Sequence, residues 1–229
     1  LRLLGKTPVV VNDGPGFYTS RVVGAYTREA LHLLNEGVSP ALIDNAAFIA
    51  GLPIGPLAMA DLTSYDLLAD IVGSLAREAR GTAVQSQGAQ QAIAKLLGAG
   101  RLGRKAAGGV YDYPPEGKTV WSGLAELFPP RSPQPSTQEV VNRLLHIQSL
   151  ETVHAMDEGI ASDPLALDAA AVLGWSYPAF RGGVLAHIDQ AGADRFVAEC
   201  DALARQHGAR FEAPASLRAM ARDGGRFHA

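Results

Sequence analysis

A pattern of charged residues between positions 21 and 37 recurs 122 positions further along the chain, and this repeat constrains the fold more than any other feature. The first set and its counterparts are Arg21, Glu29, His32, Glu36 and Gly37, then Arg143, Glu151, His154, Glu158 and Gly159. After a two-residue insertion the match continues from Pro40 and Asp44 to Pro164 and Asp168, and from Leu52-Pro53 to Tyr177-Pro178. Self-similarity at a fixed spacing indicates duplication of one structural unit. We therefore predict two copies of a three-helix module.

Prolines and glycines place the helices of the first copy. Proline suits the first helical turn, and glycine commonly follows a helix. These signals predict helices over residues 17–36, from Pro40 to about Ala50, from Pro56 to about Arg80, and from about Ala89 to Leu97. Ahead of them, Thr7–Val11 is a β-branched run, which predicts one short buried strand whose partners lie outside this sequence.

A Pro-rich stretch separates the two copies. Six prolines fall between Tyr113 and Thr137, where the helical period is weak. This composition is typical of a linker, within which we expect a short helix around residues 122–128.

Composition argues against several classes of function. The 229-residue chain has a net charge of −3 and no basic stripe, so nucleic acid is not an expected partner. The longest uncharged run, between Asp44 and Asp61, is too short for membrane insertion. The single cysteine, Cys200, excludes an intramolecular disulfide and is expected to be buried in a helix. We expect a cytoplasmic location because no targeting signal is visible, and the start at Leu1 suggests a fragment of a longer protein.

Two patterns in this chain match known binding motifs but do not indicate a binding site. Residues 98–103 match G-x-G-x-x-G, but a dinucleotide site needs a strand before the glycines and a helix after them. Here a helix precedes the glycines, so we expect a helix end and a turn. The six histidines lie at no metal-ligand spacing, so surface or half-buried histidines are expected and no metal site is predicted.

Four short strings occur in order along the chain: residues 5–21, 51–56, 103–111 and 174–183. Their sequences are GKTPVVVNDGPGFYTSR, GLPIGP, GRKAAGGVY and GWSYPAFRGG. Together they resemble the C-terminal region of the L-3-hydroxyacyl-CoA dehydrogenases, most closely that of the multifunctional α-subunits of fatty-acid β-oxidation, whose C-terminal dehydrogenase domain is duplicated. The resemblance covers nearly the whole chain, with the Pro-rich linker as the main gap.

The resemblance implies an oxidoreductase whose catalytic base is not in this chain. Members oxidise 3-hydroxyacyl-CoA to 3-oxoacyl-CoA with NAD, using a histidine–glutamate pair in an N-terminal Rossmann domain. The histidines here lack that neighbourhood, so the chain alone is expected to be inactive, with NAD bound by the missing domain. Val9–Val11 resembles the last strand of that domain's sheet. The implied partners are acyl-CoA, the missing domain and further copies in a homo-oligomer.

The resemblance also implies site residues. Ser20 matches a position near the start of the first long helix that orients the substrate, where many members have asparagine, although a plain helix serine is the alternative. The loop that closes over the acyl chain is matched by Pro53, Ile54, Gly55 and Pro56. An interhelical turn explains the same loop residues. Arg104 and Lys105 resemble a basic pair, for which structural capping is favoured over contact with CoA phosphates.

The predicted fold class is all-α: two tandem copies of a 6-phosphogluconate-dehydrogenase-C-terminal-like helical domain, packed as a pseudo-dimer. The expected parts are residues 1–13 as the tail of the missing nucleotide-binding domain, 14–113 as the first helical domain, 114–136 as the linker and 137–229 as the second domain. The second copy departs from the family pattern at Ala179 and Leu185, which favours a scaffold role. The leading function is the substrate-site and assembly portion of the dehydrogenase. The alternative is a non-catalytic module for acyl-CoA binding or oligomerisation.

Overall fold

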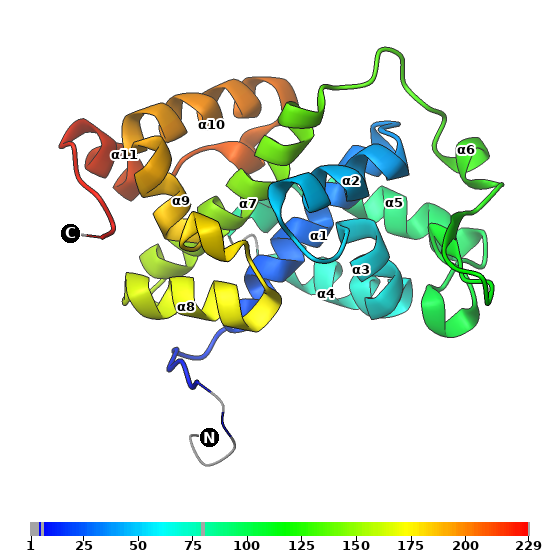
Figure 1. Cartoon of the computed structure of the whole chain (residues 1–229), viewed down its shortest axis with the longest axis horizontal. Coiled ribbons are helices and arrows are strands. Elements are labelled where there is room, and N and C mark those ends of the chain that lie inside the picture. Colours follow the sequence, from blue (N-terminus) through cyan, green and yellow to red (C-terminus); the bar gives the residue numbers. More distant parts are fainter. Residues whose placement is uncertain (1–4, 6, 79–80, 229) are drawn as a thin grey trace. The chain divides into compact units, whose positions relative to one another are not determined.

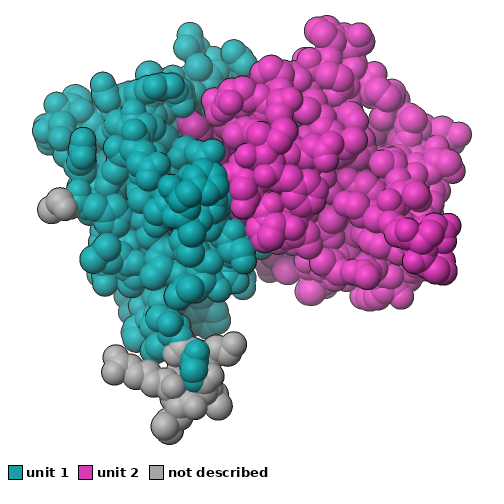
Figure 2. All heavy atoms as spheres, in the orientation of Figure 1, with its two compact units in different colours: residues 1–23, 148–229 teal, residues 24–147 magenta. Residues whose placement is uncertain are grey.

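The computed structural model describes Gly5, residues 7–78 and residues 81–228, which are mostly helical (Figure 1). Contacts between residues divide the chain into two compact units (Figure 2). Unit 1 comprises residues 1–23 and 148–229, and unit 2 comprises residues 24–147. Helix α1 (Thr19–Asn35) starts in unit 1 and ends in unit 2, whereas helix α7 (Thr137–Asp157) starts in unit 2 and ends in unit 1. The predicted all-α class is confirmed at this level.

Unit 2 contains a run of short helices and one small hairpin. Its elements between the two long helices are α2 (Pro40–Ala50), α3 (Pro56–Thr63), α4 (Tyr65–Glu78), η2 (Gly81–Gln85), α5 (Gln87–Gly98), η3 (Arg104–Ala106), β1 (Tyr111–Asp112), β2 (Thr119–Val120) and α6 (Leu124–Leu127). Helix α2 packs against α3, and α4 packs against α5. Apolar residues of α1 such as Tyr26, Leu31 and Leu34 are buried in the core.

The regular secondary structure in the described residues of unit 1 is helical. After α7 it contains α8 (Pro164–Trp175), η4 (Ala179–Arg181), α9 (Val184–Ala191), α10 (Ala193–His207), η5 (Ala209–Phe211) and α11 (Ala215–Arg222). Helix α8 packs against α9, and α10 packs against both α9 and α11. Cys200 of α10 is fully buried, as predicted, and burial raises the pKa of its thiol.

The predicted single helix from Pro56 to Arg80 is two helices. Ser64 lies between α3 and α4 with φ of 77°, a left-handed value that ends the first helix. The next residue, Tyr65, donates its backbone N–H to the carbonyl of Leu102 at 3.1 Å. Its hydroxyl donates to the carboxylate of Asp61 at 2.7 Å. These tertiary bonds replace helical ones at the break, and the predicted end at Arg80 lies outside the described residues. The predictions for α1, α2 and α5 hold to within a few residues.

The predicted strand over Thr7–Val11 is not formed, so this prediction was wrong. Residues 7–14 have no regular secondary structure, and Val10 is 92% exposed. The backbone N–H of Asn12 donates to the carbonyl of Ile160 at 2.7 Å, and the Asn12 side chain donates to Gly159, also at 2.7 Å. A strand needs a neighbouring strand for its ladder. This segment contacts a helix-ending turn of unit 1 instead.

A small hairpin spans the boundary between the predicted first domain and the predicted linker. Strands β1 and β2 pair antiparallel, with Tyr111 opposite Val120 and Asp112 opposite Thr119. Helix α6 confirms the short helix expected around residues 122–128. The hairpin was missed because each strand is two residues long and carries no readable alternation.

The G-x-G-x-x-G string is a helix end and a turn, as predicted. The N–H of Ala99 donates to Lys95 and Leu96, and Gly100 follows with φ of 73°. The expectation for the histidines was wrong at two of them, because His32 and His146 are buried inside long helices. In the part of the chain that is described, no helix is both long and apolar enough to cross a membrane.

Candidate functional site

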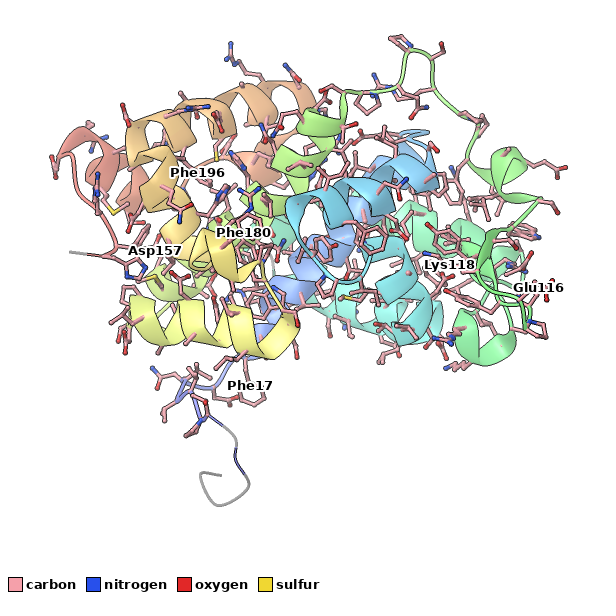
Figure 3. All side chains as sticks on the ribbon, in the orientation of Figure 1. Phe17, Glu116, Lys118, Asp157, Phe180 and Phe196 are labelled. Atoms are coloured by element: carbon pink, nitrogen blue, oxygen red, sulfur yellow. The ribbon has the colours of Figure 1, made fainter. Side chains whose placement is uncertain are left out.

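Ser20 lies on the first turn of α1, where its side chain is exposed. The preceding turn is unusual, because Gly16 and the non-glycine residue Phe17 both have left-handed backbone angles, with φ of 73° and 49°. Phe17 is also 57% exposed and points away from the helices (Figure 3). A non-glycine residue in this conformation costs free energy, and such residues cluster at functional sites. The start of α1 therefore presents a hydroxyl and an aromatic ring to the exterior of unit 1.

The residue after Ser20 anchors this exposed turn. The guanidinium of Arg21 is buried and donates to Glu151, and its two terminal nitrogens donate to the carboxylate of Glu158 at 2.7 and 2.8 Å. Beside it, the buried Tyr18 hydroxyl lies 3.2 Å from that of Thr152. Burial raises the pKa of Tyr18, so the phenol stays protonated. These contacts hold Ser20 on a fixed helical turn.

The four predicted loop residues differ in exposure. Pro53 is exposed and Ile54 is half-buried, whereas Gly55 and Pro56 are buried. A side chain at Gly55 would overlap the carboxylate of Asp44, which accepts the N–H of Leu57 at 3.0 Å and so caps α3. The group that lies close to the Gly55 backbone is therefore the Asp44 side chain. Pro53 and Ile54 are the loop residues available to a ligand.

A groove of about 360 Å³ lies on unit 2 beside this loop. We call it the Arg104 groove. It is lined by Ile54, by Ala58 and Leu62 of α3, by Pro114 and Lys118 of the hairpin, and by Arg104. In Figure 3, Lys118 lies on the helical side of the hairpin loop and Glu116 at its outer end. The structure thus brings the predicted residues Ile54 and Arg104 to one surface.

A buried carboxylate supports the base of this groove. Asp61 accepts hydrogen bonds from the hydroxyls of Tyr65 and Tyr113, at 2.7 and 2.9 Å. It also accepts the backbone N–H groups of Val110 and Tyr111, at 2.9 and 3.0 Å. Burial raises the pKa of Asp61, although these four donors oppose that shift. Sequence analysis missed Asp61 as the organising residue, and the only signal was an acidic residue within an apolar helix.

The two members of the predicted basic pair have different surroundings. Lys105 pairs with Asp66 of α4 at 3.0 Å, and both side chains are more than half exposed. Hydrogen bonds from Ser64 and Lys105 lower the pKa of Asp66 to about 2. Arg104 instead lies over the ring of Tyr113, 5.2 Å from its centroid. Lys105 therefore has an ion-pair partner on α4, whereas Arg104 contacts an aromatic ring.

No group of three or more potential metal ligands occurs in the described part of the chain. The described residues also do not fit a dinucleotide. The glycine string follows helix α5 and not a strand, and the sheet in the described residues is the two-stranded hairpin.

Sequence and structure comparisons identify the family at this point. Residues 16–113 match the model of the family described as 3-hydroxyacyl-CoA dehydrogenase, C-terminal domain. Residues 16–113 belong to this family, as the resemblance predicted, and they include Ser20, the Pro53–Pro56 loop and Arg104.

The relatives it matches are much longer proteins. The chain is 36% identical over 226 residues to the fatty acid oxidation complex subunit alpha of Shewanella putrefaciens, covering 97% of this chain and 31% of the relative. It is also 36% identical over 232 residues to the subunit of the same name from Shewanella oneidensis, covering 99% and 32%. The chain thus spans about a third of the length of these relatives.

Solved structures agree in fold. The crystal structure of 3-hydroxybutyryl-CoA dehydrogenase from Escherichia coli matches 96% of this chain and 62% of that chain, with a TM-score of 0.72 and 23% identity. The dehydrogenase part of multifunctional enzyme 1 from C. elegans covers 95% of this chain and 50% of its own, with a TM-score of 0.66 and 20% identity. At these identities the likeness concerns the fold alone.

Proposed function

We propose that this chain is the substrate-site and assembly portion of an NAD-dependent L-3-hydroxyacyl-CoA dehydrogenase of fatty-acid β-oxidation. The observation that carries the proposal is the collinear match to fatty acid oxidation complex subunits alpha over 97% of the chain. In the proposed enzyme a nucleotide-binding domain, absent from this chain, holds NAD and the catalytic histidine and glutamate. The reaction removes a proton from the substrate hydroxyl and passes a hydride to NAD.

This chain's own contribution to that reaction is to orient and enclose the acyl-CoA. Ser20 donates one hydrogen bond to the substrate from the turn fixed by Arg21. Pro53 and Ile54 contact the acyl chain, while Gly55 and Pro56 set the shape of the loop around the Asp44 cap. The exposure of Ser20 and Pro53 supports these roles, because both side chains are available to a ligand.

A Ser20→Ala change in the complete enzyme tests the orienting role. Loss of one neutral hydrogen bond is expected to lower kcat/KM by about threefold to tenfold. Ser122→Ala, at another exposed serine, is the matched control. A Ser20→Ala enzyme with kcat/KM within a factor of two of the parent would remove Ser20 from the proposed site. The chain alone is expected to show no turnover with acetoacetyl-CoA and NADH, and measurable turnover would refute the assignment of the base to another domain.

We also infer that the chain arose by duplication, with residues 14–113 and 137–229 as diverged helical domains joined by the 114–136 linker. Matched ion pairs support this. Arg21 binds Glu151 and Glu158 within unit 1, and Arg143 binds Glu29 and Glu36 within unit 2. Each arginine thus pairs with the glutamates of the other copy, as the subunits of a symmetric dimer exchange contacts. A pseudo-dimeric arrangement follows from this proposal.

The helix caps of the two copies match as well. Asp44 caps α3 through the N–H of Leu57, and Asp168 caps α9 through the N–H of Leu185 at 2.8 Å. Asp61 accepts two N–H groups of a glycine-rich turn, and Asp189 likewise accepts those of Phe227 and His228, both at 2.9 Å.

Two different residue types contact the capping aspartates Asp44 and Asp168. The Tyr111 hydroxyl donates to Asp44 at 2.8 Å, and a ring nitrogen of His228 lies 2.8 Å from Asp168. The same supporting network is thus built twice with different side chains, while residues resembling the substrate loop occur in the first copy. The second copy therefore acts as scaffold.

Cleavage within the linker tests the exchange of contacts between the two proposed copies. Because each compact unit takes residues from both copies, a chain cut between Pro130 and Arg131 is expected to remain one complex in size-exclusion chromatography. Two independently folded fragments would contradict it. A homo-oligomer of the whole enzyme and a cytoplasmic location stay predictions, which light scattering and cell fractionation check.

A further inference from the structure

A hollow of about 540 Å³ lies on unit 1 beside helices α8 and α9, which pack against each other. We call it the α8 pocket. One of its walls is an apolar stripe on α8, formed by Leu165, Ala169, Val172 and Leu173. These positions are spaced i, i+4, i+7 and i+8, so their side chains share one face of the helix. Leu165 and Leu173 are 71% and 67% exposed, and the single charged residue of α8 is the buried Asp168. An exposed apolar stripe beside a hollow is suited to an apolar ligand.

The other walls come from elements that follow α8 in the sequence. They are formed by Ala179 of η4, by Gly182, by Ala186 of α9, and by His228 near the end of the chain. A Cβ atom placed on Gly182 would lie 2.8 Å from the Cβ atom of Ala186, so these two residues are closely packed. The small side chains on this side leave the hollow open to a ligand. Its volume is within the usual range for small-molecule sites.

The polar part of the α8 pocket is a pair formed by Asp168 and His228, which both line it. The Asp168 carboxylate accepts the backbone N–H groups of Leu185 and Ala186, at 2.8 and 2.9 Å. The Nε2 atom of His228 lies 2.8 Å from the same carboxylate. Because a carboxylate can only accept hydrogen bonds, Nε2 carries the proton, and Nδ1 of the neutral ring is an acceptor. Within the part of the chain that the structure describes, this Nδ1 atom makes no hydrogen bond.

We propose that the α8 pocket binds an uncharged apolar molecule that carries one hydroxyl group, with the hydroxyl donating a hydrogen bond to Nδ1 of His228. An alcohol and a phenol share this chemistry. The site gives a ligand-binding role to the second helical copy, which otherwise serves as scaffold. The inference stands on the geometry of unit 1 and does not rest on the proposed function.

Charge and hydrogen bonding favour this class of ligand over three others. The anion of a carboxylic acid would lie close to the Asp168 carboxylate, and like charges repel. A hydrocarbon would displace water from Nδ1 of His228 and leave this acceptor without a donor, which costs free energy. An amine cation would need an oxygen of Asp168, and this carboxylate already has three donors. A hydroxyl group supplies the donor that Nδ1 lacks and adds no charge.

Calorimetry of the whole chain at pH 8 tests the proposal with 4-ethylphenol and 4-ethylanisole. The two probes have nearly the same apolar body, but only the phenol donates a hydrogen bond. The phenol is expected to bind about fivefold more tightly, which corresponds to one net hydrogen bond. His228→Phe keeps an aromatic ring in the pocket and removes Nδ1, so its affinities for the two probes are expected to agree within a factor of two. Asp168 keeps its two N–H donors in this variant, and circular dichroism verifies the fold.

Further variants separate the apolar wall from the hydrogen bond. Leu165→Gln is expected to weaken both probes about threefold, because both contact the wall. Leu67→Gln is its matched control, since Leu67 is a 49% exposed leucine outside the pocket lining. Arg226→Gln is the control for His228→Phe, because Arg226 is exposed, lies two residues away and does not line the pocket. Both controls are expected to bind 4-ethylphenol as the parent chain does.

Nitrogen-15 NMR of the parent chain measures the same contact without a variant. Addition of 4-ethylphenol is expected to shift the Nδ1 resonance of His228, because the ring nitrogen gains a donor, and 4-ethylanisole is expected to leave this resonance in place. The probe 4-ethylcyclohexanol separates the two sources of the hydroxyl. Tighter binding of this alcohol assigns the pocket to aliphatic alcohols, and tighter binding of 4-ethylphenol assigns it to phenols.

Several results would overturn the proposal. They are no binding of either hydroxyl probe, equal affinity of the parent chain for 4-ethylphenol and 4-ethylanisole, an unchanged preference in His228→Phe, and tighter binding of 4-ethylbenzoate or 4-ethylbenzylamine than of 4-ethylphenol. None of these results bears on the Ser20→Ala test in the complete enzyme, so failure of the α8 pocket and failure of the proposed function are distinguishable.

Discussion

Replacement of Arg143 by methionine is expected to destabilise the protein by about 3–5 kcal/mol, the usual cost of removing one partner of a buried ion pair. The Arg143 and Glu29 side chains are both 0% exposed, and their closest atoms lie 2.6 Å apart. The second partner, Glu36, is 31% exposed, so it regains water and adds little to the loss. The penalty therefore comes from the Glu29 carboxylate, which stays buried without its guanidinium.

Urea unfolding followed by far-ultraviolet circular dichroism measures this effect. With a urea dependence of about 1–3 kcal/mol per molar, the midpoint is expected to fall by at least about 1 M. Adding Glu29→Gln to Arg143→Met removes the stranded charge, so the double variant is expected to regain at least half of the loss. Arg195→Met, which removes an exposed pair with Glu199, is the control and is expected to cost less than about 0.5 kcal/mol. A loss below about 1 kcal/mol for Arg143→Met would refute the reasoning.

Three further changes have definite expected results. Gly55→Ala is expected to cost about 1–3 kcal/mol in thermal melts because the new methyl group overlaps Asp44, whereas Gly98→Ala, with open space around it, is expected to be neutral or stabilising. Burial lowers the pKa of His154 below the usual histidine value of about 6.5, so the folded chain binds fewer protons than the unfolded chain, and stability is expected to fall as pH drops below about 6.5. A His154→Gln variant should lose that part of the pH dependence, and an unchanged slope would contradict the assignment. The Cys200 thiol, buried and with a raised pKa, is expected to react with a thiol reagent only after denaturant is added, and rapid labelling of the native chain would exclude its burial.

The sequence predicted those parts of the fold that local chemistry decides. Helix α2 begins at Pro40 and ends before Gly51, which has φ of 100°, because proline and glycine act through their own backbone preferences. The break at Ser64 was not predictable, since it depends on the bond from Tyr65 to the distant Leu102. The prediction of a strand over Thr7–Val11 was wrong for a related reason. A strand forms only when it pairs with a second strand, and the sequence contains one candidate.

For the repeat as well, the sequence predicts some features and not others. The recurring positions of Arg21 and Arg143 were visible, yet spacing alone does not tell that Arg21 binds Glu151 and that Arg143 binds Glu29. The contacts of Tyr111 with Asp44 and of His228 with Asp168 were not predictable, because two different residue types bind the two aspartates. At the candidate site, the sequence proposed Ile54 and Arg104 separately, and the groove that joins them depends on the missed hairpin.

Helices α1 and α7 each have residues in both compact units, and this division sets an order for folding during synthesis. Unit 2 is one continuous segment, residues 24–147, so it can close as soon as that segment has left the ribosome. Unit 1 needs residues 148–229 to meet residues 1–23, and until then Arg21 and Tyr18 have none of the partners that bury them. The turn that carries Ser20 is therefore among the last parts of this chain to become fixed, and a ribosome that stops early leaves unit 2 intact and the start of α1 without its anchor.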